Sequence, residues 1–152
     1  MIRKVGSGLV SLLIVFLFLG SSVFAASYSF SGTMKLRMLD GSENGVYYSI
    51  GSNKNISISG KVKCIGYNAK EVEKDIRGNK VGVQTTYIQL YEINNSGIGT
   101  PLCGSSVKVS SSSGSMSFSS TGRSKYSKKK YMYIYKPMND GYDLAISGSI
   151  TY

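Results

Sequence analysis

Apolar and polar residues alternate along most of the chain, a pattern typical of β-strands with one buried face. The alternation begins at Tyr28 and Phe30 and recurs in later segments: 56–64, 81–93, 107–109, 116–118, 131–135 and 144–152. Turn-forming residues such as Asn44-Gly45 separate these segments. The pattern predicts an all-β protein, an antiparallel β-sandwich or a small barrel of about eight short strands.

Residues 69–80 interrupt the alternation, and both a short helix and a charged hairpin loop fit them. Glu71, Glu73 and Asp75 would share one face of a strand, where three carboxylates could bind Ca²⁺. Lysine and arginine residues alternate with these acids, which favours a solvated loop of mixed charge. We therefore expect no metal site.

The first 25 residues have the organisation of an export signal. Arg3 and Lys4 precede an apolar run over 9–19, and Val23-Phe24-Ala25 provides small residues three and one before a cut. An uncleaved membrane anchor is the alternative, but a span needs about 20 apolar residues. We predict a signal peptide over 1–25 and a single secreted β-domain over 26–152, either free outside the cell or retained at the cell envelope.

The chain has two cysteines, Cys64 and Cys103, and both lie in the expected mature protein. Export to an oxidising compartment makes a disulfide the usual outcome for a single pair, so we predict a Cys64–Cys103 bond. Two separate buried thiols are the alternative.

Composition excludes most common catalytic machinery. The sequence has no histidine, so it has no Ser-His-Asp triad, no Cys-His dyad and no histidine-ligated metal. Two thiols cannot form a Cys₄ zinc site. The eight acids include no pair that is marked out for glycoside hydrolysis. We predict a protein that is not an enzyme and that has no cofactor.

The net charge of +10 comes largely from one stretch, 123–136, which has six basic residues and no acid. Such a density of like charge could bind a polyanion such as a wall polymer, a nucleic acid or an anionic membrane. Alternatively, these basic residues keep the protein soluble or protect an edge strand of the sheet. The sequence shows no motif for a specific nucleic acid.

Tyrosines lie within and beside this stretch. Tyr131, Tyr133 and Tyr135 share one face of a predicted strand, and Tyr87 and Tyr91 share one face of another. If these faces point outward, they form an aromatic surface that can stack on sugar rings or bases. The interpretation that we favour places the tyrosines in the core and Met132 and Ile134 outside, because aromatic rows commonly arise from cross-strand packing.

These observations give a first functional hypothesis, a secreted β-domain that binds an anionic polymer or glycan. The candidate ligand-binding residues are Arg123, Lys125, Tyr126, Lys128, Lys129, Lys130, Tyr131, Tyr133 and Tyr135. Alternatives are a toxin or antimicrobial protein that acts on anionic membranes, a protein inhibitor, and a structural surface component.

Overall fold

The structure is a computed structural model that describes residues 25–152, and in this range it contains eight strands and no helix. The predicted signal peptide lies almost entirely outside the described residues. The strands are β1 (Ser27–Met34), β2 (Met38–Asp40), β3 (Asn55–Tyr67), β4 (Thr85–Ile93), β5 (Gly99–Lys108), β6 (Ser115–Arg123), β7 (Lys130–Tyr135) and β8 (Tyr142–Thr151).

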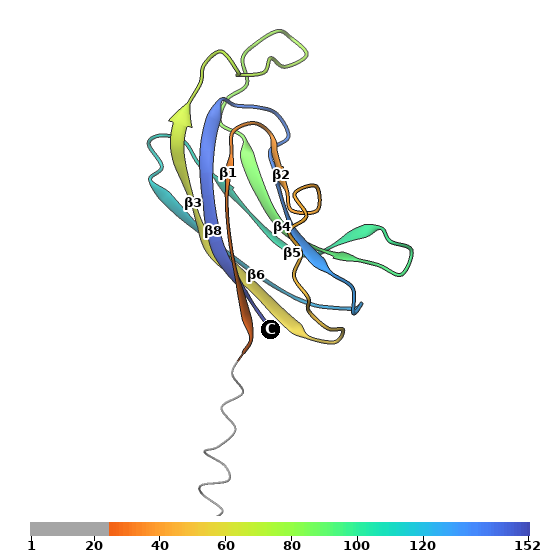
Figure 1. The fold of residues 1–152 in the computed structure, drawn as a ribbon. Helices are drawn as coiled ribbons and strands as arrows, with labels where there is room; N and C mark the ends of the chain where they lie inside the picture. Colours follow the sequence, from red (N-terminus) through yellow and green to blue (C-terminus); the bar gives the residue numbers. More distant parts are fainter. Residues whose placement is uncertain (1–24) are drawn as a thin grey trace, which may run out of the picture.

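The strands form two antiparallel sheets that pack face to face (Figure 1). One sheet, sheet A, has the order β1-β8-β3-β6, and the other, sheet B, has the order β2-β7-β4-β5. The predicted β-sandwich and the number of strands are therefore confirmed. No helix in the described residues is long and apolar enough to cross a membrane.

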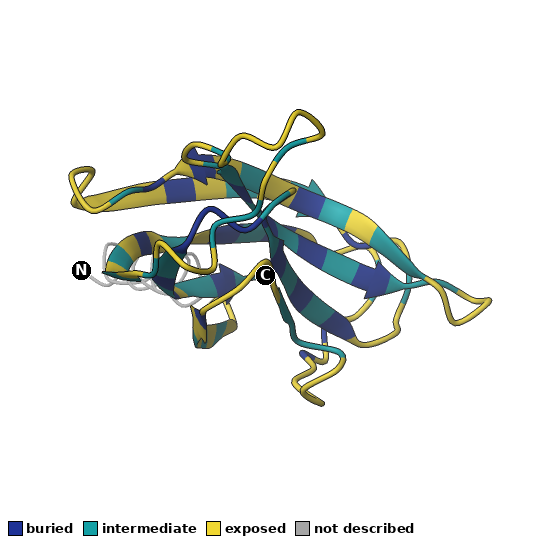
Figure 2. Cartoon of the chain, turned by 90° about the horizontal axis from the view of Figure 1, so that it is seen from above, coloured by how far each residue is buried: buried dark blue, intermediate teal, exposed yellow. Residues whose placement is uncertain are grey.

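The core lies between the sheets and contains one side of each alternating strand. In Figure 2, buried residues alternate with half-buried or exposed ones along the strands. Ile58 and Val62 of β3 and Ile88 and Leu90 of β4 all belong to this core, and all four are fully buried. The predicted C-terminal strand is present as β8, and it pairs with both β1 and β3.

The 69–80 segment forms a charged loop, one of the two structures that the sequence allowed. A bridge joins Lys74 to Lys80, and the carboxylate of Asp75 accepts the backbone N–H of Arg77 and of Asn79, each at 2.9 Å. Glu73 forms a 3.6 Å ion pair with Arg37. These acids therefore serve turn geometry and a surface ion pair.

The predicted disulfide is wrong for this structure, because both cysteines are free. Cys103 lies against Gly122, where an added Cβ would be 3.0 Å from the Cβ of Cys103. Gly122 pairs with Ile56, and Cys64 lies eight residues further along β3. At about 3.3 Å per residue this separation is about 26 Å, far beyond disulfide reach.

Candidate functional site

The tyrosine rows lie on the outer face of sheet B. Met132 and Ile134 of β7 are buried at 6% and 1% exposure, whereas Tyr131, Tyr133 and Tyr135 are half-buried on the opposite face. The interpretation that placed these tyrosines in the core is therefore wrong. The aliphatic residues fill the space between the sheets, and strand alternation then directs the tyrosines outward.

The tyrosines pack into one continuous surface. Strand register places Tyr87 opposite Tyr135 and Tyr91 opposite Tyr131. The ring centroids of the first pair are 5.0 Å apart, and those of the second pair are 5.6 Å apart. We call this surface the tyrosine platform, and its members are Tyr47, Tyr87, Tyr91, Tyr131, Tyr133 and Tyr135.

A shallow groove of ≈ 290 Å³ runs beside the platform, between β4 and β5. Tyr87 and Gln89 line one side, and small residues of β5, among them Gly104 and Ser106, line the other. An added Cβ on Gly104 would lie 2.7 Å from the Cγ of Gln89, so the glycine leaves room for the Gln89 side chain beside β5. The groove thus combines an aromatic wall with an amide that both donates and accepts hydrogen bonds.

Burial raises the pKa of Tyr91 and of Tyr131. The neighbouring tyrosine hydroxyls and the carboxylate of Asp40 raise both pKa values further. Both hydroxyls therefore stay protonated at neutral pH. The platform therefore offers phenol donors beside its aromatic faces.

The basic stretch 123–136 has both exposed and buried side chains in the structure. Arg123, Lys125, Lys128 and Lys129 are exposed. Lys129 places its ammonium 5.3 Å from the ring centroid of Tyr47, which itself meets Tyr131 edge to face. Lys129 therefore borders the platform and connects it to the basic loop.

Lys130 is fully buried, so its assignment as a surface ligand-binding residue is wrong. Its ammonium donates to the carbonyls of Ile50 and Lys128 at 2.7 and 2.9 Å and lies 3.9 Å from the carboxylate of Glu92. Burial lowers the pKa of Lys130, and the carboxylate of Glu92 partly offsets this shift. Lys130 has the same parity as Met132, and it therefore points inward with it.

Lys136 is buried for the same reason. Its ammonium donates to Asp140 at 2.6 Å and to the carbonyl of Tyr142 at 2.8 Å. The other oxygen of Asp140 accepts the backbone N–H of Gln84 at 2.7 Å. The carboxylate of Asp140 therefore links the segment after β7 to the segment before β4.

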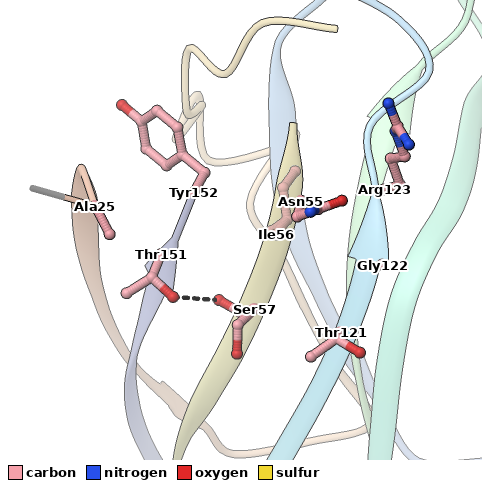
Figure 3. Close-up of a pocket in the computed structure, with 9 residues that line it drawn as sticks. All are labelled: Ala25, Asn55, Ile56, Ser57, Thr121, Gly122, Arg123, Thr151 and Tyr152. Atoms are coloured by element: carbon pink, nitrogen blue, oxygen red, sulfur yellow. Dashed lines mark hydrogen bonds between the residues drawn. The ribbon is translucent and has the colours of Figure 1, made fainter. Parts of the chain in front are cut away.

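A second concavity, of ≈ 550 Å³, lies at one end of sheet A (Figure 3). Ser57, Thr121 and Thr151 place hydroxyls along it, with Arg123 at one side and Tyr152 at the other. Its rim includes Ala25, the first described residue. In the described range, no group of three or more acids or cysteines could hold a metal ion.

Comparison with known proteins places the fold among solved β-sandwiches. No protein-family model matches the sequence, and no curated protein matches it either. The chain is similar in structure to the CBM22-1 xylan-binding domain of Xyn10C from Paenibacillus barcinonensis, with a TM-score of 0.52 and 12% identity. The match covers 81% of this chain and 70% of that one.

Weaker structural similarities are to a protein described as "CBM4 structure and function" and to the C-terminal domain of EclA, described as a sugar-binding protein. Their TM-scores are 0.42 and 0.41, and their identities to this chain are both 7%. The first match covers 82% of this chain and 61% of that one, and the second covers 83% and 77%. At these identities the similarities concern the β-sandwich itself.

Proposed function

We propose that the protein is a secreted, non-enzymatic module that binds a glycan across the tyrosine platform, with anionic groups of the polymer contacting nearby lysines. The observation that carries this proposal is the continuous outer row of stacked tyrosines beside the groove that contains Gln89. Similarity to a xylan-binding domain supports the glycan class. The apolar start of the sequence supports export.

The platform suits a sugar polymer because sugar rings have C–H faces and hydroxyl edges. Tyrosine rings contact the faces, and phenol hydroxyls and the amide of Gln89 bind the edges. The six tyrosines come from β4, β7 and the 46–50 segment, so the surface can contact several successive rings. Lys129 adds a cation at one end, where an acidic substituent would lie.

The test is binding of the purified protein to a panel of soluble polysaccharides, with Tyr91→Ala and Tyr133→Ala as the platform variants. Stacking on one aromatic ring is worth about 1–3 kcal/mol, so each variant should lose about fivefold or more in affinity. Tyr67→Ala is the matched control, because Tyr67 is 53% exposed and lies in sheet A.

Platform variants that bind every polysaccharide as well as the wild type would overturn the proposal. If a ligand binds equally well at low and high salt, the platform part of the proposal would stand and the lysine contact would be ruled out, because screening weakens exposed charge pairs. A ligand whose affinity falls at high salt would support both the platform and the lysine contact.

A further inference from the structure

A buried ion pair fixes the basic loop from inside. Glu92 and Lys130 lie opposite each other in the register of β4 and β7, and their side chains are 4% and 0% exposed. The carboxylate of Glu92 accepts the backbone N–H of Lys125 at 3.1 Å and that of Tyr126 at 3.3 Å. The ammonium of Lys130 donates to the carbonyls of Tyr126 and Lys128.

These contacts set the direction of the loop backbone. Its amides point to the buried carboxylate and its carbonyls point to the buried ammonium, so the side chains of Lys125 and Lys128 are left to the outside. The charge of Lys130 is compensated by Glu92 within the pair. The exposed lysines therefore determine the charge that a ligand meets.

The outer side of this loop borders a polar pocket of ≈ 440 Å³, which we call the loop pocket. Its lining residues are Ser52, Asn95, Lys125, Tyr126, Ser127 and Lys128. The hydroxyl of Ser127 accepts the backbone N–H of Ser52 at 3.3 Å and donates to its hydroxyl at 3.1 Å, which ties two of the lining loops together. A third loop contributes Asn95.

No carboxylate is available in these three loops to neutralise the lysines. The sequence has no acid between Glu43 and Glu71 and none between Glu92 and Asp140. Lys129 points elsewhere, toward the ring of Tyr47. Two lysines without a carboxylate partner in these loops therefore line the loop pocket, together with residues that carry hydroxyl and amide groups, and this set suits an oxyanion.

We propose that the loop pocket binds one oxyanion, namely the sulfate, phosphate or carboxylate substituent of a glycan. Lys125 and Lys128 supply charge, Ser52 and Asn95 supply neutral donors, and Ser127 orients the hydroxyl of Ser52 through the hydrogen bond that it donates to it. The glycan context rests on the proposed function, whereas binding of the free oxyanion does not.

The first experiment follows backbone amide signals by NMR while sodium sulfate or sodium phosphate is added to the full protein. Sodium chloride at equal ionic strength is the reference. We expect saturable shifts at 125–128, at Ser52 and at Asn95. Shifts that follow ionic strength equally with all three salts would overturn the proposal.

The second experiment compares a double variant, Lys125→Ala/Lys128→Ala, with a matched control, Lys61→Ala/Lys63→Ala. The control removes two exposed lysines from the outer face of sheet A and the same net charge. We expect about tenfold weaker sulfate or phosphate binding in the first and little change in the second. Equal losses in the two would show diffuse charge attraction and overturn a discrete site.

Matched polymers distinguish the source of the anion. Dextran sulfate against dextran tests a sulfate ester, and polygalacturonate against its methyl ester tests a carboxylate. Ser127→Ala provides a milder variant if the double variant fails to fold. A protein with Tyr91→Ala that still binds inorganic sulfate, but no polymer, would show that the loop pocket stands independently of the platform.

Discussion

Tyr87 and Tyr135 stack across strands β4 and β7, with ring centroids 5.0 Å apart and ring planes inclined by only 17°. The two residues are direct partners in the register of the sheet. Tyr133 packs against Tyr135 on the same face, with centroids 5.3 Å apart. Each ring is held by a neighbour, so the platform exists before a ligand arrives, and binding loses less side-chain entropy.

A double-mutant cycle on Tyr87 and Tyr135 should show direct coupling between the rings. We expect a coupling energy of about 0.5–1.5 kcal/mol in urea unfolding of Tyr87→Ala, Tyr135→Ala and the double variant. Tyr87→Ala combined with Ser119→Ala, on the outer face of sheet A, should be additive. Additivity within the tyrosine pair as well would mean that the stacking contributes no stability of its own.

Strand parity explains how much of the site the sequence could predict. Lys130 at the start of β7 and Lys136 just after its end have the parity of Met132 and Ile134, and the three tyrosines have the other. Alternation therefore fixes these two sets, but it does not say which set faces the core. The frequent cross-strand packing of aromatic rows favoured the tyrosines for the core, yet Met132 and Ile134 fill the core and both lysines point inward with them.

The burial of those lysines depends on partners that alternation cannot locate. Glu92 is 38 positions from Lys130 in the sequence, and only the pairing of β4 with β7 brings them together. The disulfide prediction failed for a related reason. Cys64 and Cys103 both occupy largely inward positions, but they lie in opposite sheets and far apart along the strands.

Substitution of Gly60 should strongly destabilise the fold. Gly60 pairs with Gly148 in sheet A, and an added Cβ would lie 2.2 Å from the carbonyl oxygen of Ser147 and 2.7 Å from the Cα of Gly148. Both contacts are with backbone, which cannot rotate away. We expect Gly60→Ala to cost about 3 kcal/mol or more in chemical denaturation.

Gly51→Ala is the control for Gly60→Ala. No atom lies within 4 Å of an added Cβ on Gly51, and its φ is not among the positive values. Gly51→Ala should change the free energy of unfolding by no more than about 0.5 kcal/mol. If Gly60→Ala and Gly51→Ala lowered the free energy of unfolding equally, β3 and β8 would not be packed closely at Gly60.

The two thiols should react at different rates. Cys103 is 9% exposed, and burial raises its pKa to about 11, whereas Cys64 is half-buried. Thiolate is the reactive form, so a maleimide should label Cys64 in the native protein and Cys103 only after unfolding. Mass spectrometry counts the labels. If neither thiol is labelled in denaturant without reductant, the protein contains the disulfide.

Alkaline pH should destabilise the protein partly through Cys103. Its folded pKa, about 11, exceeds the ordinary value of 9.0, so the unfolded thiol ionises first. The stability that this thiol contributes is complete below about pH 9 and is lost as pH rises through about 11. Cys103→Ala should flatten the loss of unfolding free energy over this interval. A residual slope is expected, because the pKa values of Tyr48, Tyr91 and Tyr131 are raised as well.

Lys136→Met should be costly because it leaves a buried carboxylate without its ammonium partner. Lys136 and Asp140 are 2.6 Å apart, and their side chains are 0% and 1% exposed. Removing one member of such a pair costs about 3–5 kcal/mol. Adding Asp140→Asn removes the unpaired charge and keeps an oxygen to accept the backbone N–H of Gln84, so the double variant should be more stable than Lys136→Met.

The exposed pair Arg37–Glu73 is the matched control for the buried one. Its atoms are 3.6 Å apart, and the side chains are 53% and 36% exposed. Exposed ion pairs are worth about 0–1 kcal/mol, so Glu73→Gln should change urea stability little. A loss for Lys136→Met as small as that for Glu73→Gln would mean that water reaches Asp140 once the lysine is gone. A double variant less stable than Lys136→Met would show that the charge on Asp140, rather than its oxygens, holds the segments together.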